Sequence, residues 1–443
     1  MKTPTVNVGI MAEKTVVFVL NDEYVHVESG EFLIGEQRAS LLKGGIVFNG
    51  KRYDELFFEP SSSTASFDLK AVTIGINFHW QRKEDQRFQG ALHIVIKNDT
   101  VVVINRIDVE EYLTCVISSE MSATASPEFL KAHAVISRSW LFAQMSKTHR
   151  RHPDHQHTSA TQSTCVSLNK ERIRWYDRED HDIFDVCADD HCQRYQGITR
   201  ASTPWAAEVV RQTRGEILVK NDAICDTRFS KCCGGITEKF EHVWEPTPHS
   251  YLTALRDSRE EIVFPDLTIE EEAAKWIVSS PASFCNTSNK ETLSQVLNHY
   301  DQETADFYRW KVRYSQQQLS ELIHRKSGIS FGAIIDLIPL KRGTSGRIEK
   351  LKIAGSLSTC IIGKELEIRR TLSETHLYSS AFIIEKESID KDGIPGYFIL
   401  TGAGWGHGVG LCQIGAAVMG NQGYDYKQIL NHYYPGTDIT KRY

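Results

Sequence analysis

Residues 108–145 read DVEEYLTCVISSEMSATASPEFLKAHAVISRSWLFAQM, and this stretch predicts two helices joined by a short junction. The first helix is expected to start at Asp108, because Glu111 three residues later completes a pattern that resembles a capping box. The second is expected to start at Ser126, because Pro127 suits the first position of a helix. Apolar residues then recur on one broad side of the second helix, which is typical of a helix packed on a core.

One carboxylate lies at the expected junction of the two helices. It belongs to Glu120, which stands between a pair of serines and Met121. A carboxyl group beside small polar residues and an apolar side chain can hold a proton and serve as a general acid. An isolated glutamate in a turn is, however, more often a solvated surface residue. The residues alone therefore leave the role of Glu120 open.

The motif around this glutamate resembles that of a known family. The string E-Y-L…V-I-x-x-E-M…L-K-A-x-A-V-x-x-R-S in residues 111–139 is similar to the core motif of the stage II sporulation protein D and LytB amidase-enhancer family. The resemblance implies that Glu120 is the catalytic acid of a peptidoglycan lytic transglycosylase, and that Arg138 of the R-S pair binds substrate. Three residues depart from the usual pattern, and they are Ser122, His133 and Ser139.

Two histidines and two cysteines gather farther along the chain, and they are His181, Cys187, His191 and Cys192. Nitrogen and sulfur ligands suit tetrahedral zinc. The spacing alone equally allows two buried cysteines and two surface histidines, since an adjacent His-Cys pair is unusual for a zinc finger. Family enzymes carry the pattern His-…-Cys-…-His-Cys-Gln, and the resemblance therefore implies a structural zinc ion held by all four residues.

A glycine-rich string, GAGWGHGVGLCQIGA, occupies residues 402–416. It has neither the lysine of a P-loop nor the order G-x-G-x-x-G, so it does not predict a nucleotide site. Glycines permit close approach to a flat ligand, and a turn packed in the core explains the pattern equally well. The string is specific to the family, and the resemblance implies that it binds a glycan strand through Gly404, Trp405, His407, Gly408 and Gln413.

A second turn, residues 228–238, resembles the family's Ser-Ser-Gly-Gly-x-Thr element. The resemblance implies that Ser230 contributes to substrate binding. Cys232 and Cys233 stand where serines are common, and the sequence leaves open whether they pair with Cys225, with Cys412 or with each other, or stay free.

Composition limits the possible functions. The net charge of -6 and the lack of a long basic run argue against nucleic-acid binding. No window approaches the run of about eighteen apolar residues that a membrane-spanning helix needs. The first twenty residues show no signal peptide, although the resemblance implies a location in the cell envelope. The ten cysteines cluster, which fits metal ligation at least as well as a disulfide framework.

The chain is expected to be a multidomain α+β protein with a β-rich platform, catalytic helices, a helical insert and a long substrate cleft. Its 443 residues suffice for two or three domains. The expected parts are a β-rich domain at 1–104, a catalytic core with the zinc loop at 105–257, a helical insert at 258–332, and a C-terminal segment at 333–443 that completes the core.

Two main hypotheses for the function follow. The first is a lytic transglycosylase that cleaves glycan strands without stem peptides to anhydromuramyl products, with Glu120 as general acid and base. The alternative is a non-catalytic amidase enhancer that binds peptidoglycan and stimulates a partner amidase. The presence of Glu120 favours the enzyme. A redox or metal-handling protein built on the cysteines is a third possibility.

Overall fold

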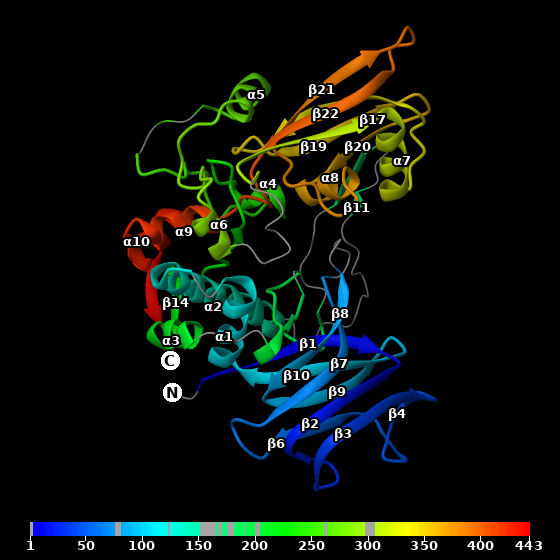
Figure 1. The fold of residues 1–443 in the computed structure, drawn as a ribbon, viewed down its shortest axis with the longest axis vertical. Helices are drawn as coiled ribbons and strands as arrows, with labels where there is room; N and C mark the ends of the chain where they lie inside the picture. Colours follow the sequence, from blue (N-terminus) through cyan, green and yellow to red (C-terminus); the bar gives the residue numbers. More distant parts are fainter. Residues whose placement is uncertain are drawn as a thin grey trace. The chain divides into compact units, whose positions relative to one another are not determined.

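The computed structural model describes residues 3–75, 81–122, 125–150, 165–166, 171–174, 181–189, 191–199, 204–260, 263, 265–296 and 306–443. The chain forms two compact units (Figure 1). The first unit comprises Met1–Gln156, Arg178–Asp226 and Ile439–Tyr443, and the second comprises His157–Asp177 and Thr227–Asp438. Both units combine helices with several sheets, so the expected mixed α+β multidomain fold is confirmed.

The first unit is built on an 11-stranded sheet with the order β13-β1-β10-β9-β6-β2-β3-β4-β5, to which β7 and β8 are added through β2. Its strands are β1 (Thr5–Glu13), β2 (Thr15–His26), β3 (Glu31–Leu42), β4 (Gly45–Phe48), β5 (Lys51–Tyr53), β6 (Leu56–Pro60), β7 (Ser66–Ile74), β8 (Arg82–Gln89), β9 (Ala91–Lys97), β10 (Thr100–Asp108) and β13 (Val186–Cys187). The alternation of apolar residues in β1 and β2 buries every second side chain.

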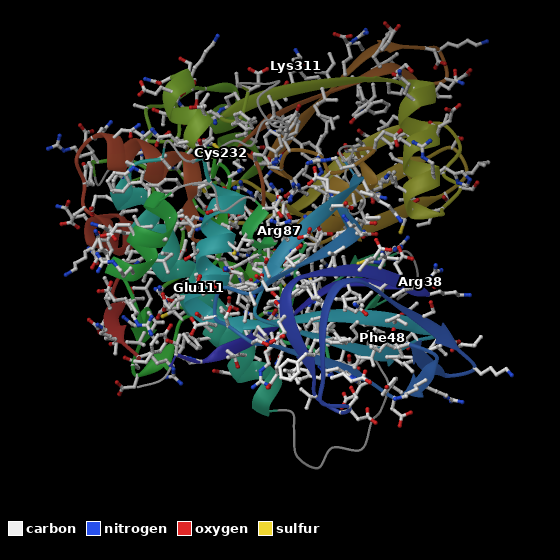
Figure 2. The ribbon with its side chains drawn as sticks, turned by 60° about the horizontal axis from the view of Figure 1, so that its bottom comes forward. Arg38, Phe48, Arg87, Glu111, Cys232 and Lys311 are labelled. Atoms are coloured by element: carbon white, nitrogen blue, oxygen red, sulfur yellow. The ribbon has the colours of Figure 1, made fainter. Side chains whose placement is uncertain are left out.

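Two local features show why these strands form. Asn98 and Asp99 join β9 to β10 with φ angles of 48° and 56°, which is the left-handed conformation that a two-residue hairpin turn needs. Aromatic rings fill one part of the sheet's core, where Phe48 packs edge-on against Phe58 with ring centroids 5.5 Å apart (Phe48 is labelled in Figure 2). Hairpins and ring packing together hold the platform from which the helices start.

The helix pair follows directly from β10. The helices are α1 (Val109–Glu120) and α2 (Pro127–Arg150), and they lie together with α3 (Pro204–Gln212). Asp108 caps α1 by accepting a hydrogen bond from the backbone N–H of Glu110 at 2.8 Å, which differs from the expected capping box with Glu111. Burial and two neighbouring carboxylates raise the pKa of Glu111, which is labelled in Figure 2. The expected start of the second helix at Ser126-Pro127 is confirmed.

A small three-stranded sheet completes the first unit. Its order is β15-β14-β24, and its strands are β14 (Glu216–Lys220), β15 (Ala223–Ile224) and β24 (Asp438–Lys441). β14 packs against α2. A short 3₁₀ helix, η1 (Gly197–Thr199), connects the loop after β13 to β8 through a hydrogen bond from the Arg87 N–H to the Thr199 hydroxyl at 2.8 Å.

In the part of the second unit that the structure describes, the strands form three further sheets. Their orders are β11-β12-β20-β19-β18, β17-β22-β21 and β16-β23. The strands are β11 (Cys165–Val166), β12 (Glu171–Arg174), β16 (Phe229–Ser230), β17 (Arg309–Ser315), β18 (Ile334–Arg342), β19 (Ile348–Gly355), β20 (Thr359–Gly363), β21 (Phe382–Ile389), β22 (Pro395–Ala403) and β23 (Leu411–Cys412). Because β17 pairs along its whole length with β22, the segment expected to be a helical insert also supplies a sheet strand.

The helices of the second unit are α4 (Phe240–Val243), α5 (Glu270–Val278), α6 (Lys290–Val296), α7 (Gln316–Ser327), α8 (Glu365–Thr371), α9 (Gln413–Asn421) and α10 (Tyr426–Tyr433). α7 begins with a capping box formed by Ser315 and Gln318. Its apolar face, including Leu319 and Ile323, enters a core shared with Trp310. Among the described residues, no helix is both long and apolar enough to cross a membrane.

Candidate active site and metal centre

Glu120 is the last residue of α1, and its side chain is partly exposed. Its Oε1 atom accepts a hydrogen bond from the backbone N–H of Arg194 at 3.0 Å. The preceding residue makes a parallel contact, since the Ser119 hydroxyl accepts from the Gln196 N–H at 3.3 Å. These two bonds fasten the loop after Cys192 to the C-terminal end of α1, and they orient the Glu120 carboxylate.

The loop that carries Arg194 is held on the platform at several points. Its short strand β13 runs parallel to β1, and the Asp185 carboxylate accepts a hydrogen bond from the Asn7 N–H at 2.8 Å. The Tyr195 hydroxyl donates to the Asn105 side chain at 2.6 Å, in a buried position between the sheet and the helices. The loop is therefore a fixed part of the first unit, and the contact with Glu120 follows from this docking.

The same loop brings together the residues expected to bind zinc. One ligand atom of each of the four lies within 4.8 Å of the others, and the four are His181, Cys187, His191 and Cys192. The Cys192 sulfur is 3.4 Å from His181 Nε2 and 3.5 Å from His191 Nδ1. The Cys187 sulfur is 3.8 Å from His191 Nδ1. Two imidazoles and two thiols at these separations can surround one tetrahedral metal ion.

The electrostatics of this cluster favour metal binding. Hydrogen bonding from the Cys192 thiol, and then from His181 and His191, holds the pKa of Cys187 far below its usual range even though burial acts to raise it. A thiolate is the form that binds a metal ion. A pocket of about 250 Å³ lies beside the cluster and is lined by Gly9, Val72 and Gln86 as well as by cluster residues. Glu120 is not among the residues that line this pocket.

Arg138 does not occupy a position from which it can bind substrate. Its side chain is fully buried on α2, and its guanidinium makes two hydrogen bonds to the Glu110 carboxylate at 2.9 and 2.7 Å. A third bond reaches the Glu216 carbonyl at 3.0 Å. The expected substrate-binding role of Arg138 is therefore wrong. A buried arginine needs such partners to offset its lost hydration, and here it ties α1 to α2 and β14.

The glycine-rich turn belongs to the second unit. The Trp405 ring stacks on Phe307 with centroids 4.6 Å apart and meets Tyr378 edge-on at 4.9 Å. Its backbone forms a two-way bridge with Cys232, at 2.8 and 3.0 Å. One face of the indole ring is thus covered by Phe307. The ring remains partly exposed, so part of it can still contact a ligand.

Gly408 is buried beneath an arginine. A Cβ atom built on it would lie 2.4 Å from Cζ of Arg347, and its φ angle is +78°. Arg347 also donates to the Gly406 carbonyl at 3.1 Å and to the Cys233 carbonyl at 3.2 Å. Gly404 is enclosed similarly, with the Cys232 carbonyl 2.8 Å from its would-be Cβ. Both glycines are therefore required by internal packing, which is the alternative that the sequence left open.

The remaining predicted binding residues differ in exposure. His407 is partly exposed, and its Nδ1 atom accepts a hydrogen bond from the Val409 N–H at 3.0 Å, which leaves Nε2 to carry the proton of a neutral ring. Ser230 and Gln413 are buried. β16 and β23 run side by side and pair Ser230 with Cys412, so the two family turns are brought together. Glu120 belongs to the first unit. The cluster of His181, Cys187, His191 and Cys192, called the zinc-type cluster below, belongs to the first unit as well.

Sequence reasoning missed two groups of residues. Arg194 and Gln196 contact the C-terminal end of α1 through their backbone N–H groups. Their residue types therefore do not indicate these contacts in the sequence. Glu238 is fully buried and accepts hydrogen bonds from the backbone and hydroxyl groups of Thr344 and Ser345, at 2.6 to 3.1 Å. Glu238 donates its own N–H to the Gly408 carbonyl at 2.9 Å. It thereby supports the glycine-rich turn from a position 170 residues earlier in the chain.

Comparison with known proteins finds similarity over two parts of the chain. Residues 97–219 match the model described as a stage II sporulation protein, and residues 238–410 match a domain of unknown function. An uncharacterized protein of Brachyspira hyodysenteriae is 26% identical over 353 residues, covering 80% of this chain and 72% of that protein. Stage II sporulation protein D of Bacillus amyloliquefaciens is 24% identical over 342 residues, covering 76% of each chain.

A third relative, the amidase enhancer of Bacillus subtilis, is 24% identical over 251 residues, which are 53% of this chain and 32% of that protein. The first family match spans α1, α2, Glu120 and the whole zinc-type cluster. The chain thus contains, at residues 97–219, a domain that matches the stage II sporulation protein family, and its relatives include proteins named stage II sporulation protein D and amidase enhancer.

Proposed function

We propose that the protein is a peptidoglycan lytic transglycosylase in which Glu120 is the catalytic acid and base. The observation that carries the proposal is the position of this carboxylate. It ends α1 within the family domain, it is partly exposed, and within the part of the chain that the structure describes one hydrogen bond, from the Arg194 N–H, orients it. A carboxyl group that is held at one oxygen keeps its second oxygen available for proton transfer.

The reaction then needs only one carboxyl group from the protein. Glu120 protonates the glycosidic oxygen that leaves muramic acid. As a carboxylate, it then takes the proton from the muramyl C6 hydroxyl, whose oxygen attacks C1 and closes an anhydro ring. Ordinary glycosidases use two carboxylates because water or the enzyme supplies the nucleophile. Here the substrate supplies it, so no attacking water has to be activated.

The zinc-type cluster has a structural role in this proposal. Zinc held by two imidazoles and two thiolates leaves no coordination position for water or substrate. Cys192 lies two residues before Arg194, so a fixed Cys192 also fixes the N–H group that contacts Glu120. His181, Cys187, His191 and Cys192 thus position the acid indirectly, and none of them takes part in the proton transfer.

The glycan contacts that we assign to the second unit are those of partly exposed groups. Trp405 offers the uncovered part of its ring to a sugar, and His407 is a partly exposed residue of the same turn. Gly404 and Gly408 shape the turn, and Ser230 and Gln413 support it from buried positions. Peptidoglycan as substrate implies a location in the cell envelope.

A second candidate function is supported by one comparison. One relative is named an amidase enhancer, although this chain matches only 32% of it. Under this alternative, the protein binds glycan strands and stimulates a partner amidase, and Glu120 has no chemical role.

Product analysis distinguishes the two functions. Purified protein is incubated with glycan strands stripped of stem peptides, and the products are read by mass spectrometry. The enzyme releases anhydromuramyl ends. Glycan binding without anhydromuramyl products contradicts the transglycosylase and favours the enhancer.

A further inference from the structure

A second cluster of potential metal ligands lies in the interior of the second unit. It consists of Cys233, Asp257, Cys285 and Cys412, and one ligand atom of each lies within 4.8 Å of the others. All four are buried, and Asp257 and Cys412 are completely inaccessible. Cys232, labelled in Figure 2, is a further buried thiol at its edge. The family match that contains the first cluster ends at residue 219, so this cluster lies outside it.

The four residues come from segments that are far apart in the sequence. Cys412 ends β23, which pairs with β16, and Cys233 follows β16 by three residues. Asp257 and Cys285 belong to the connections before and after α5, and the Phe284 N–H donates to the Asp257 carbonyl at 2.7 Å. Each residue is thus delivered by a separately anchored part of the backbone, which is how a structural metal site joins segments.

The distances suit a metal ion. The sulfur atoms of Cys233 and Cys285 are 3.6 Å apart. Tetrahedral zinc with bonds of about 2.3 Å to sulfur separates its sulfur ligands by about 3.7 Å. A disulfide instead needs about 2.05 Å, and pairing two of the thiols would leave the third beside a buried carboxylate. The Cys412 sulfur accepts a hydrogen bond from the Cys233 N–H at 3.2 Å, a contact that stabilises a thiolate.

The carboxylate is held in a fixed orientation. Asp257 Oδ1 accepts from the Tyr433 hydroxyl at 2.6 Å, and Oδ2 accepts from the Cys285 N–H at 3.0 Å. His432 Nε2 is 3.8 Å from Oδ1. Gly415 makes room for this group, because a Cβ atom there would lie 2.6 Å from Oδ1. Each carboxylate oxygen retains a second lone pair, so Asp257 can ligate a metal while keeping these bonds.

Charge balance also favours a cation. A buried carboxylate is costly unless a positive charge compensates it. Arg347 contacts the Cys233 carbonyl, and His432 is the imidazole beside Asp257. A divalent cation would neutralise the carboxylate and the thiolates together.

We infer that Cys233, Cys285, Cys412 and Asp257 bind a structural zinc ion that joins four segments of the second unit. Three sulfur ligands and one oxygen ligand form a closed tetrahedral site of the kind zinc occupies. This site is independent of the proposed catalytic function, and together with the first cluster it gives two zinc ions per chain. Because folding delivers the ligands, binding stabilises the folded second unit.

The test counts zinc by elemental mass spectrometry on the full chain purified under reducing conditions. The wild type should contain two zinc ions per chain. A Cys187→Ser/Cys192→Ser variant should retain one, and adding Cys285→Ser should remove it. Cys360→Ser is the matched control, because it removes a buried thiol of the same unit that lies outside the cluster. This control should retain two zinc ions.

Cobalt provides a second measurement that does not require the Cys285 variant to fold. The Cys187→Ser/Cys192→Ser protein, loaded with Co²⁺, should show thiolate-to-cobalt charge-transfer absorption and tetrahedral ligand-field bands. Folded Cys187→Ser/Cys192→Ser protein without zinc and without these bands would overturn the inference. Iron in place of zinc, or a Cys233–Cys285 disulfide found by peptide mapping of protein prepared without oxidant, would overturn it as well.

Discussion

The backbone N–H of Arg194 donates a hydrogen bond to Oε1 of Glu120 at 3.0 Å. This contact joins the loop of the zinc-type cluster to the end of the helix that carries the proposed acid. It separates two properties of Glu120 that substitutions can test one at a time, namely its ability to transfer a proton and its ability to accept this hydrogen bond.

The first prediction concerns proton transfer. Glu120→Gln keeps an amide oxygen that can accept the hydrogen bond from the Arg194 N–H. The amide cannot, however, serve as the general acid or the general base. Release of anhydromuramyl products should fall at least about 10²–10⁴-fold, the usual contribution of general acid–base catalysis. Thermal stability should change little, because the side chain is partly exposed. Glu128→Gln, on the next helix, is the control and should remain active. Full activity of Glu120→Gln would remove this residue from the mechanism.

The second prediction concerns the zinc-type cluster of His181, Cys187, His191 and Cys192. Cys192→Ser should lose one zinc ion per chain, and X-ray absorption of the wild type should include sulfur ligands at about 2.3 Å and nitrogen ligands at about 2.0 Å. Cys225→Ser is a matched control, since this buried thiol of the same unit lies outside the cluster. If Cys192→Ser retained all its zinc, the cluster would not be a zinc site.

The third prediction concerns the buried ion pair of Arg138 and Glu110. Arg138→Met leaves the Glu110 carboxylate buried without its partner, so the free energy of unfolding should fall by about 3–5 kcal/mol. Arg211→Met breaks an exposed pair with Glu208 and should leave the free energy of unfolding nearly unchanged, because solvent screens that pair. Urea denaturation measures both. A stable Arg138→Met variant that had lost only glycan binding would restore the substrate-binding role.

The fourth prediction compares two glycines with the same φ angle of +78°. Gly408→Ala must place a Cβ atom against Arg347, whereas Gly393→Ala has no atom within 4 Å. In both variants, an alanine in the left-handed backbone conformation should lower the free energy of unfolding by about 1–2 kcal/mol. In Gly408→Ala, overpacking against Arg347 should lower the free energy of unfolding by about a further 1–3 kcal/mol. Equal melting temperatures for the two variants would show that the turn is not tightly packed.

The fifth prediction concerns pH. His242 Nδ1 lies 3.2 Å from Glu349 Oε2, and this hydrogen bond is the largest cause of the raised pKa of His242. A raised pKa in the folded state gives stability that is fully present below the ordinary value of 6.5 and is lost as the pH rises through the folded value. The pKa of Glu349 is lowered because His242 and Lys341 outweigh its burial, so its contribution is present above 4.5 and is lost at lower pH.

The pair should therefore contribute most between about pH 4.5 and 6.5. Thermal melts of the wild type should show a larger loss of stability between pH 5.5 and 8.5 than melts of His242→Gln, which cannot become charged. Parallel pH profiles for the two proteins would contradict this assignment.

Features that depend on residues close together in the chain could be predicted from the sequence. Pro127 after Ser126 begins α2, as the sequence predicts. The first metal cluster was also visible, because its ligands lie within twelve residues of one another, from 181 to 192. Such features depend on neighbours along the chain, so residue types and spacing are sufficient to predict them.

Contacts between distant segments were decided only by the tertiary structure. The sequence does not indicate that the Arg194 backbone reaches Glu120, that Arg138 is buried on Glu110, or that Gly408 lies beneath Arg347. It also does not indicate that Cys233, Asp257, Cys285 and Cys412 meet. The physical reason is that each of these contacts closes a loop whose entropic cost is offset by packing elsewhere in the unit. Residue types predict the chemistry of a side chain, whereas the packing of the whole unit determines which groups it meets.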